Sequence, residues 1–373
     1  MKPKKLFRIF PVLVVCILSQ ASLFACSADE NTAFFSTHLS KEEQSAAIAV
    51  PMLLPESAAF PVSGILPSDA PPERDTIKMH FVGDVMLAAE NGDDDFWSFN
   101  LFAYDTPKAY YFEKMFPLFS SDDWTVANGE NVFTDAENPE KIAKKEDPAF
   151  WYYSKAENAQ IYSAGSVEIV SLANNHAMDY GVSGRDDTKA AIEAAGAMCV
   201  LDGTSVTLEK SGVTVALLCT SMYSEYYLTP ILDWLTEAQK TSDFQIVYYH
   251  GGTERVHTPD GWRVNASHAM VEAGADLVLG NHPHVLQPIE TYQGVDIVYS
   301  LGNFLFGGSH TCENRTMVYA LTLDLVDHKI NAVKGEAIPC YCYGELWQPA
   351  MIEEEQNKET VMSFLRGERE TPY

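Results

Sequence analysis

The order of predicted elements along the chain indicates a layered α/β fold, with central β-sheets flanked by helices. From Thr76 onward, short runs rich in β-branched and aromatic residues alternate with segments whose apolar residues recur every three or four positions. This alternation is typical of layered α/β architectures and argues against a β-sandwich. In addition, nearly every predicted strand is followed directly by an acid, an amide or a histidine. In α/β sheets, ligands gather beyond the carboxyl ends of the strands.

Two kinds of segment make up the predicted domain, which covers residues 76–348 and has the length of one large α/β unit. The strand-like runs span 77–82, 124–127, 167–172, 213–219, 244–249, 276–279, 295–299, 317–325 and 332–338. The helix-like runs span 156–164, 184–195, 230–239 and 263–273. After Trp347 the chain becomes acidic and then polar, so we expect residues 349–373 to form a C-terminal tail, as a short helix or a frayed end.

The first residues predict export of the chain. Residues 1–8 carry four basic side chains, an apolar run covers 9–18, and the small residues Ala21 and Ser22 follow. This order is typical of a secretory signal peptide, and the apolar run is shorter than the roughly 20 residues of a membrane-spanning helix. We therefore interpret residues 1–25 as a signal peptide of the lipoprotein type.

The end of this segment predicts lipid attachment. Leu23-Phe24-Ala25-Cys26 resembles the lipobox of bacterial lipoproteins, in which the cysteine receives the lipid, although Phe24 departs from the small residue usual there. A lipid on Cys26 would place the domain outside the cytoplasm, anchored to the cell membrane. Simple secretion and an uncleaved anchor are the alternatives. Residues 26–75 are rich in Ala, Ser and Pro, which is typical of a tether.

The acidic composition limits the partners of the chain. The net charge is −27, and it becomes −31 once residues 1–25, with four basic side chains and no acid, are removed. Such a charge argues against nucleic acid as a partner and repels polyanions at long range. An anionic polymer would therefore need bound metal to reverse the field near the site.

Residues at the strand ends form a candidate metal site. Directly after predicted strands the sequence has Asp84, Glu130, Asn174-Asn175-His176, His250, Glu254, His282 and His284. Carboxylates, amide oxygens and imidazoles are ligands that zinc, manganese and iron accept, and the set contains no thiolate. A bridging carboxylate with terminal histidines can hold two metal ions about 4 Å apart and activate water for attack on a phosphoester. We therefore expect a pair of divalent metal ions as cofactors.

Each of these residues also has a purely structural interpretation. The pair Gly83-Asp84 after a strand is more often a turn or a helix cap, and a single histidine such as His250 more often completes a core. Independent turns, however, have no physical reason to carry this set of residues at successive strand ends. The combination therefore favours metal binding.

Four segments carry a resemblance to a known family. They cover residues 81–86, 171–181, 274–284 and 299–304, with the sequences FVGDVM, SLANNHAMDYG, GADLVLGNHPH and YSLGNF. Over residues 78–306 the chain resembles the bacterial capsule synthesis proteins of the CapA group, which include poly-γ-glutamate synthesis proteins and are related to calcineurin-like metallophosphoesterases. The resemblance implies a layered, metallophosphoesterase-like (calcineurin-like) fold.

The resemblance also implies a role for each residue of the site. The metal ligands would be Asp84, Glu130 as the bridging acid, Asn175 through its amide oxygen, His250, His282 and His284. His176 resembles the histidine that stabilises the transition state or protonates the leaving group. Asp179, Glu254 and Asn303 would orient these groups by hydrogen bonding.

The site departs from the family pattern at three places. The segment usually read Asn-Leu-Glu is Asn128-Gly129-Glu130 here. Gly251 and Arg255 stand where the pattern has aromatic residues, which removes two side chains from the wall of the site. Asn281 replaces the first histidine of Gly-His-His-Pro-His. If that histidine were the ligand and His282 a spacer, one metal would bind weakly or not at all.

Two functions from different classes fit these residues. The first is a metal-dependent hydrolase that acts on a phosphoester or on an anionic surface polymer such as poly-γ-glutamate. The second is a non-catalytic surface component that keeps the fold and helps to assemble or export a polymer. Membrane-bound components of polymer synthesis are expected partners in both. The retained His176 favours catalysis, whereas the altered Asn281 and Gly251 favour the second function.

Overall fold

The computed structural model describes residues 72–90, 98–146, 148–308 and 313–373. The predicted signal peptide, Cys26 and the predicted tether as far as residue 71 lie outside the described residues. The first strand, β1, spans Arg74–Met86 and so begins just before the predicted start of the domain at Thr76. None of the helices in the described ranges combines the length and the apolar character needed to cross a membrane.

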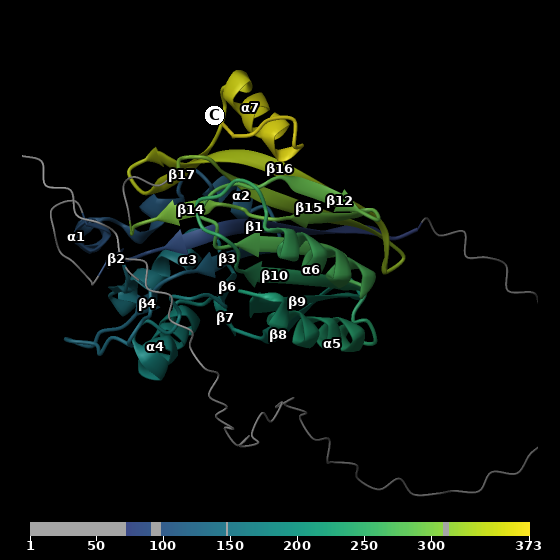
Figure 1. Cartoon of the computed structure of the whole chain (residues 1–373). Helices are drawn as coiled ribbons and strands as arrows, with labels where there is room; N and C mark the ends of the chain where they lie inside the picture. The colour runs from purple at the N-terminus through teal and green to yellow at the C-terminus, as the bar shows by residue number, and fades with distance from the viewer. Residues whose placement is uncertain (1–71, 91–97, 147, 309–312) are drawn as a thin grey trace, which may run out of the picture. The chain divides into compact units, whose positions relative to one another are not determined.

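Strand β1 lies at the centre of an eight-stranded sheet (Figure 1). It pairs in parallel with β3 (Trp124–Gly129) and β14 (Asn303–Phe306), and antiparallel with β15 (Thr316–Val326). Beyond β3 the sheet continues with β6 (Ile169–Leu172) and β7 (Met198–Leu201). Beyond β15 it continues with β16 (Lys329–Glu345) and β17 (Gln348–Met351).

A second sheet has six strands in the order β12, β13, β11, β10, β9, β8. Its parallel centre consists of β9 (Val213–Ser221), β10 (Phe244–His250) and β11 (Leu277–Asn281). The other members are β8 (Thr204–Lys210), β12 (Ile289–Tyr292) and β13 (Val295–Val298). A small third sheet joins β2 (Ala89–Glu90), β5 (Tyr152–Ser154) and β4 (Val132–Phe133).

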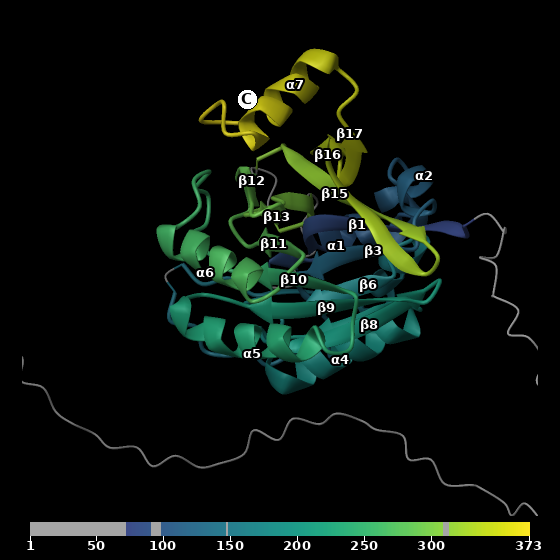
Figure 2. The same cartoon turned by 90° about the vertical axis from the view of Figure 1, so that its right-hand side faces the viewer.

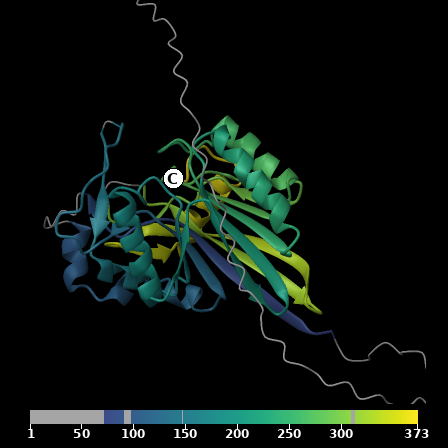
Figure 3. The ribbon, with the colours of Figure 1, turned by 90° about the horizontal axis from the view of Figure 1, so that it is seen from below.

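Helices cover the outer faces of both large sheets (Figures 2 and 3). Against the first sheet pack α1 (Phe99–Asp105), α2 (Phe116–Phe119), α3 (Gln160–Ala164), α4 (Gly181–Ala194) and the 3-10 turns η1 (Lys108–Phe112) and η2 (Ala156–Ala159). Against the second sheet pack α5 (Leu228–Ala238) and α6 (Gly261–Glu272), and the short turn η3 (Glu225–Tyr227) precedes α5.

The main core lies between the two large sheets. On β1, alternate side chains point into it, and Ile77, Met79 and Phe81 pack with Leu217 of β9 and Ile246 of β10. Alternation of this kind follows from the two-residue repeat of a strand, which gives each sheet one face for the sheet partner and one for the helices. The result is a four-layered arrangement of helices, sheet, sheet and helices, which confirms the predicted layered α/β fold.

Each strand or helix predicted from the sequence overlaps an observed element of the same kind. The predicted and observed bounds agree best for two apolar runs, since residues 213–219 lie within β9 and residues 244–249 within β10. The elements that the sequence did not predict are short or lie at sheet edges. They are β2, β4, β5, β7, β8, β12, β14, β17, α1, α2, η1 and η3.

The C-terminal segment, predicted as a short helix or a frayed tail, packs against the rest of the fold. It contains the end of β17 and the helix α7 (Glu355–Leu365), which lies beside β16 (Figure 1). Val361, Phe364 and Leu365 recur at three- and four-residue spacing on one face of α7, and all three are buried in the main core. The apolar face of α7 is therefore part of the hydrophobic core.

We expect Phe364→Ala to lower the free energy of unfolding by about 3–5 kcal/mol, because it removes a buried aromatic side chain from the main core. Urea denaturation followed by circular dichroism measures this change. Tyr104→Ala is the matched control, since Tyr104 is 78% exposed and its loss should cost less than about 0.5 kcal/mol. Equal stability of the two variants would mean that α7 does not belong to the cooperative core.

Candidate metal centre

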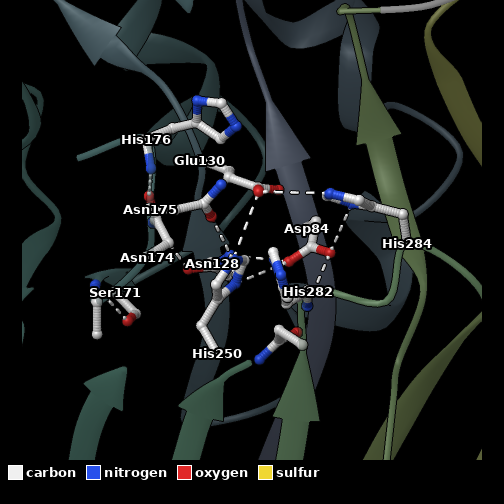
Figure 4. A network of polar contacts seen from close by, with 12 residues as sticks. Asp84, Asn128, Glu130, Ser171, Asn174, Asn175, His176, His250, His282 and His284 are labelled. Carbon is white, nitrogen blue, oxygen red and sulfur yellow. Dashed lines mark hydrogen bonds and ion pairs between the residues drawn. The ribbon is translucent and has the colours of Figure 1, made fainter. Parts of the chain in front are cut away.

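The carboxyl ends of the parallel strands meet at one place in the fold and bring the predicted site residues together (Figure 4). The first sheet supplies Asp84 in β1, Glu130 after β3, and Asn175 and His176 after β6. The second sheet supplies His250 at the end of β10, and His282 and His284 after β11. The register between neighbouring strands places these residues at similar heights along each sheet, since Asp84 lies opposite Asn128 and His250 lies opposite Asn281. The centre therefore lies at the seam between the two sheets.

Glu130 is the common member of this group. Its Oε1 lies 3.5 Å from Nε2 of His250 and 3.6 Å from Nε2 of His284. Its side chain is fully buried, and neither carboxylate oxygen has a hydrogen-bond partner among the described residues. A buried carboxylate without hydrogen bonds is costly unless a cation lies beside it. This arrangement fits a bridging ligand between two metal ions.

Two sets of ligand atoms surround Glu130. One consists of Asp84, Glu130 and His284, and the other of Glu130, His250 and His282, and within each set the atoms lie within 4.8 Å of one another. Oδ1 of Asn175 lies 2.8 Å from Nε2 of His250, which directs the amide oxygen towards the second set. Carboxylate, imidazole and amide oxygen together suit zinc, manganese or iron. The residues present thus fit a two-metal centre.

The pKa values of the two acids shift in opposite directions. Burial raises the pKa of Glu130 well above its usual value, and the negative charge of Asp84 raises it further. Burial also acts to raise the pKa of Asp84, but hydrogen bonds from His250 and His284 outweigh this effect and hold the pKa well below its usual range. Glu130 is therefore the acid that most needs a cation, because a bound divalent ion would reverse the local field.

Two buried amides to which the sequence analysis gave no role of their own hold the ligands in place. Nδ2 of Asn128 donates to Oδ1 of Asp84 at 2.8 Å and lies 3.0 Å from Nδ1 of His250. Asn174 in turn donates to Oδ1 of Asn128 at 3.1 Å and to the carbonyl oxygen of Gly129 at 2.9 Å. Hydrogen bonds of this kind fix the orientation of metal ligands. The signal for both residues was their position at a strand end, next to a predicted ligand.

The loop after β11 turns both of its histidines into the centre through an unusual backbone. His282 and His284 have φ angles of 95° and 58°, in the left-handed region that side chains other than glycine rarely adopt. Nδ1 of His284 lies 2.9 Å from Oδ1 of Asn303 and 3.1 Å from Oδ2 of Asp84, so its Nε2 faces Glu130. The backbone N–H of His282 donates to Oδ2 of Asp84 at 3.2 Å. These contacts offset part of the energetic cost of the two positive φ angles.

His176 lies beside the two ligand sets without belonging to either (Figure 4). Its Nδ1 is 2.9 Å from Oδ2 of the fully buried Asp179, and burial lowers the pKa of the imidazole in spite of this contact. Asp179 also forms an ion pair with Lys144 and accepts a hydrogen bond from the backbone N–H of Tyr152 at 2.8 Å. Because Asp179 occupies Nδ1, Nε2 is the ring nitrogen of His176 that lies outside this contact.

Two of the three departures from the family pattern have clear structural consequences. Asn281 lies outside all three ligand sets, is fully buried at the end of β11, and its Nδ2 is 3.3 Å from the carbonyl oxygen of Tyr249. His282, by contrast, lies in two of the sets, which favours His282 over position 281 as the ligand in this loop. At Gly251, a Cβ atom would lie 1.7 Å from the carbonyl oxygen of Met222, so no side chain fits there.

An aromatic side chain nevertheless lines this part of the centre. Tyr223, which follows β9, places its ring 5.6 Å from that of His282 and 6.3 Å from that of His250. The predicted Glu254 lies at the exposed rim, with Oε1 4.0 Å from Nε2 of His282, and forms a third ligand set with His282 and His284. Tyr223 and Glu254 thus both lie beside His282 in the wall of the centre.

Comparison with known proteins agrees with the resemblance seen in the sequence. Across 273 residues the chain is 31% identical to the PGA biosynthesis protein CapA of Bacillus subtilis (strain 168), covering 66% of this chain and 68% of the relative. Across 278 residues it is 28% identical to the capsule biosynthesis protein CapA of Bacillus anthracis, covering 67% of this chain and 65% of the relative. The chain therefore spans about two thirds of the length of these relatives.

Among solved structures, a hypothetical protein from Thermus thermophilus covers 70% of this chain and 99% of its own, with 17% identity and a TM-score of 0.42. The family model described as bacterial capsule synthesis protein PGA_cap matches residues 78–308, which include every residue of the metal centre named above. The chain belongs to this family of bacterial capsule synthesis proteins.

Proposed function

We propose that the chain is a metal-dependent phosphoester hydrolase that serves capsule or poly-γ-glutamate synthesis at the cell surface. The observation that carries the proposal is the buried carboxylate of Glu130, which has no hydrogen-bond partner among the described residues and lies between two sets of metal-type ligands. Bound divalent ions would polarise a phosphoryl oxygen and lower the pKa of water. His176, held by Asp179 beside this centre, supports hydrolysis as the reaction.

The residues of the chain have separate tasks in this proposal. Nε2 of His176, the ring nitrogen that Asp179 does not occupy, would donate a proton to the leaving oxygen, and the negative charge of a bound phosphoester would favour the protonated ring against the effect of burial. Asn128 and Asn303 would keep Asp84 and His284 in their rotamers. Lys144 and Tyr152 fix the carboxylate of Asp179, so the imidazole of His176 has one orientation relative to the substrate.

The cellular context of the proposal comes from the relatives, whose names refer to capsule and PGA biosynthesis. The substrate would be an anionic surface polymer or a phosphoester, and membrane-bound components of polymer synthesis would be partners. A lipid on Cys26 would hold the domain outside the cytoplasm, at the cell membrane. Divalent ions at Glu130 would also offset the acidic charge of the chain where such a substrate enters.

The alternative is a non-catalytic component that assembles or exports the polymer. Asp179 argues against this alternative, because it is a fully buried acid whose contacts position His176 without touching a ligand set. A metal site with a purely structural role does not need an oriented imidazole beside it. A chain that binds metal but hydrolyses neither a phosphodiester nor poly-γ-glutamate would support the alternative.

We expect His282→Ala to reduce the bound transition metal from about two equivalents per chain towards one, because it removes an imidazole from the second ligand set. Elemental analysis of the purified chain, reconstituted with manganese or zinc, measures the content. Asn281→Ala is the matched control next to it in the sequence and should keep the metal. If Asn281→Ala loses metal and His282→Ala does not, the assignment of ligands in this loop is incorrect.

We expect His176→Ala to lower kcat for bis(4-nitrophenyl) phosphate by about 10²- to 10⁴-fold without changing the metal content, because the imidazole moves a proton and binds no metal. Asp179→Asn should have a smaller effect in the same direction. His268→Ala, which removes a histidine paired with Glu290 outside the centre, should stay within about twofold of the parent. Full activity of His176→Ala would refute the proposed role of this residue.

A further inference from the structure

Two tyrosines form an aromatic corner at the edge of the metal centre. Tyr223 and Tyr227 pack with their ring centroids 5.9 Å apart and their planes at 90°. Tyr223 also faces His282 and His250, so the aromatic corner begins where the second ligand set ends. Tyr223 is 37% exposed and Tyr227 44%, which leaves parts of both rings open to solvent.

The segment that carries the aromatic corner is acidic. Asp202 lies beside its first residue, because its Oδ1 accepts a hydrogen bond from the backbone N–H of Ser221 at 2.7 Å. Residues 221–240, which carry both tyrosines and α5, contain Glu225, Asp233 and Glu237 but only one basic residue, at the far end. Within the described part of the chain, no lysine or arginine lies over either ring.

The chemistry of such a surface selects against a polyanionic chain. Exposed tyrosine faces attract organic cations through the negative charge of the ring face, and neighbouring carboxylates add to this attraction. A chain of glutamate units would meet Glu225 and the negative faces of the rings. A cationic group on the alcohol part of a phosphoester would instead lie against the aromatic corner while the phosphate lies at the metal centre.

We propose that the aromatic corner of Tyr223 and Tyr227 binds an ammonium or quaternary ammonium group, so that the substrate is a phosphodiester of a cationic alcohol. This inference rests on the proposed function and specifies its substrate class. Tyr227 is the residue that tests it, because its ring packs against Tyr223 and none of its described contacts is with a histidine of the centre. Replacement of Tyr227 therefore leaves the ligand sets intact.

The test compares two phosphodiesters of the same shape, 4-nitrophenyl phosphorylcholine and 4-nitrophenyl 3,3-dimethylbutyl phosphate, in which a neutral tert-butyl group replaces the trimethylammonium group while the phosphate keeps its negative charge. We expect the metal-loaded chain to prefer the choline ester in kcat/KM by roughly 3- to 30-fold. Tyr227→Leu should bring the ratio close to one, and Tyr227→Phe should keep most of it because the aromatic face remains. Tyr104→Leu, at an exposed tyrosine outside the centre, is the control and should leave the ratio unchanged. Equal kcat/KM values for the two esters in the parent chain would overturn the inference while the hydrolase function stands.

A binding measurement separates this inference from the proposed function. Calorimetric titration with tetramethylammonium chloride, against a sodium chloride blank, should show binding to the parent chain that Tyr227→Leu weakens at least threefold and Tyr227→Phe does not. This binding result would support the cation site even if the chain hydrolysed neither ester. In that case only the proposed hydrolase function would be refuted. Binding that is absent, or identical in the parent and Tyr227→Leu, would overturn the cation site.

Discussion

The buried carboxylate of Glu130 is the constraint around which the centre is built. It lies at the seam of two sheets, beside a second acid, Asp84, and no hydrogen bond from a described residue offsets the cost of its burial. His250 and His284 approach it through Nε2 at 3.5 and 3.6 Å. Carboxylates of one sheet thus meet imidazoles of the other, and a cation between them would stabilise the contact between the two sheets as well as the site.

The surrounding fold holds this cluster in place at some cost in backbone strain. His282 and His284 both have positive φ angles, and each such residue costs on the order of 1–3 kcal/mol. Asp84 offsets part of that cost, because it accepts from the backbone of His282 and lies beside Nδ1 of His284. In this conformation both imidazoles of the loop after β11 reach ligand sets that include Glu130, so the strain lies where strained backbone is typical, at a candidate functional site.

The parts of the structure that could be predicted from the sequence are those set by local patterns. β9 and β10 are continuous apolar runs, and Asp84 or His250 follow such runs directly. Asn128 and Tyr223 were missed, because their roles come from contacts across the two sheets, and neither residue type indicates a metal site by itself. The short edge strands, such as β2 and β4, were missed since two residues carry no periodicity.

The two sheets contribute different side chains to the centre, and this difference bears on which parts of the site can change. The first sheet carries the carboxylates and the pair of His176 with Asp179, whose buried contacts tolerate little change. The second sheet carries the imidazoles and, in the loops after β9 and β10, Tyr223 and Glu254 beside His282. There Gly251 lies so close to the carbonyl oxygen of Met222 that a side chain at position 251 would require the backbone next to Tyr223 to move. The two loops are therefore coupled in shape, while Glu130 and Asp84 belong to the other sheet.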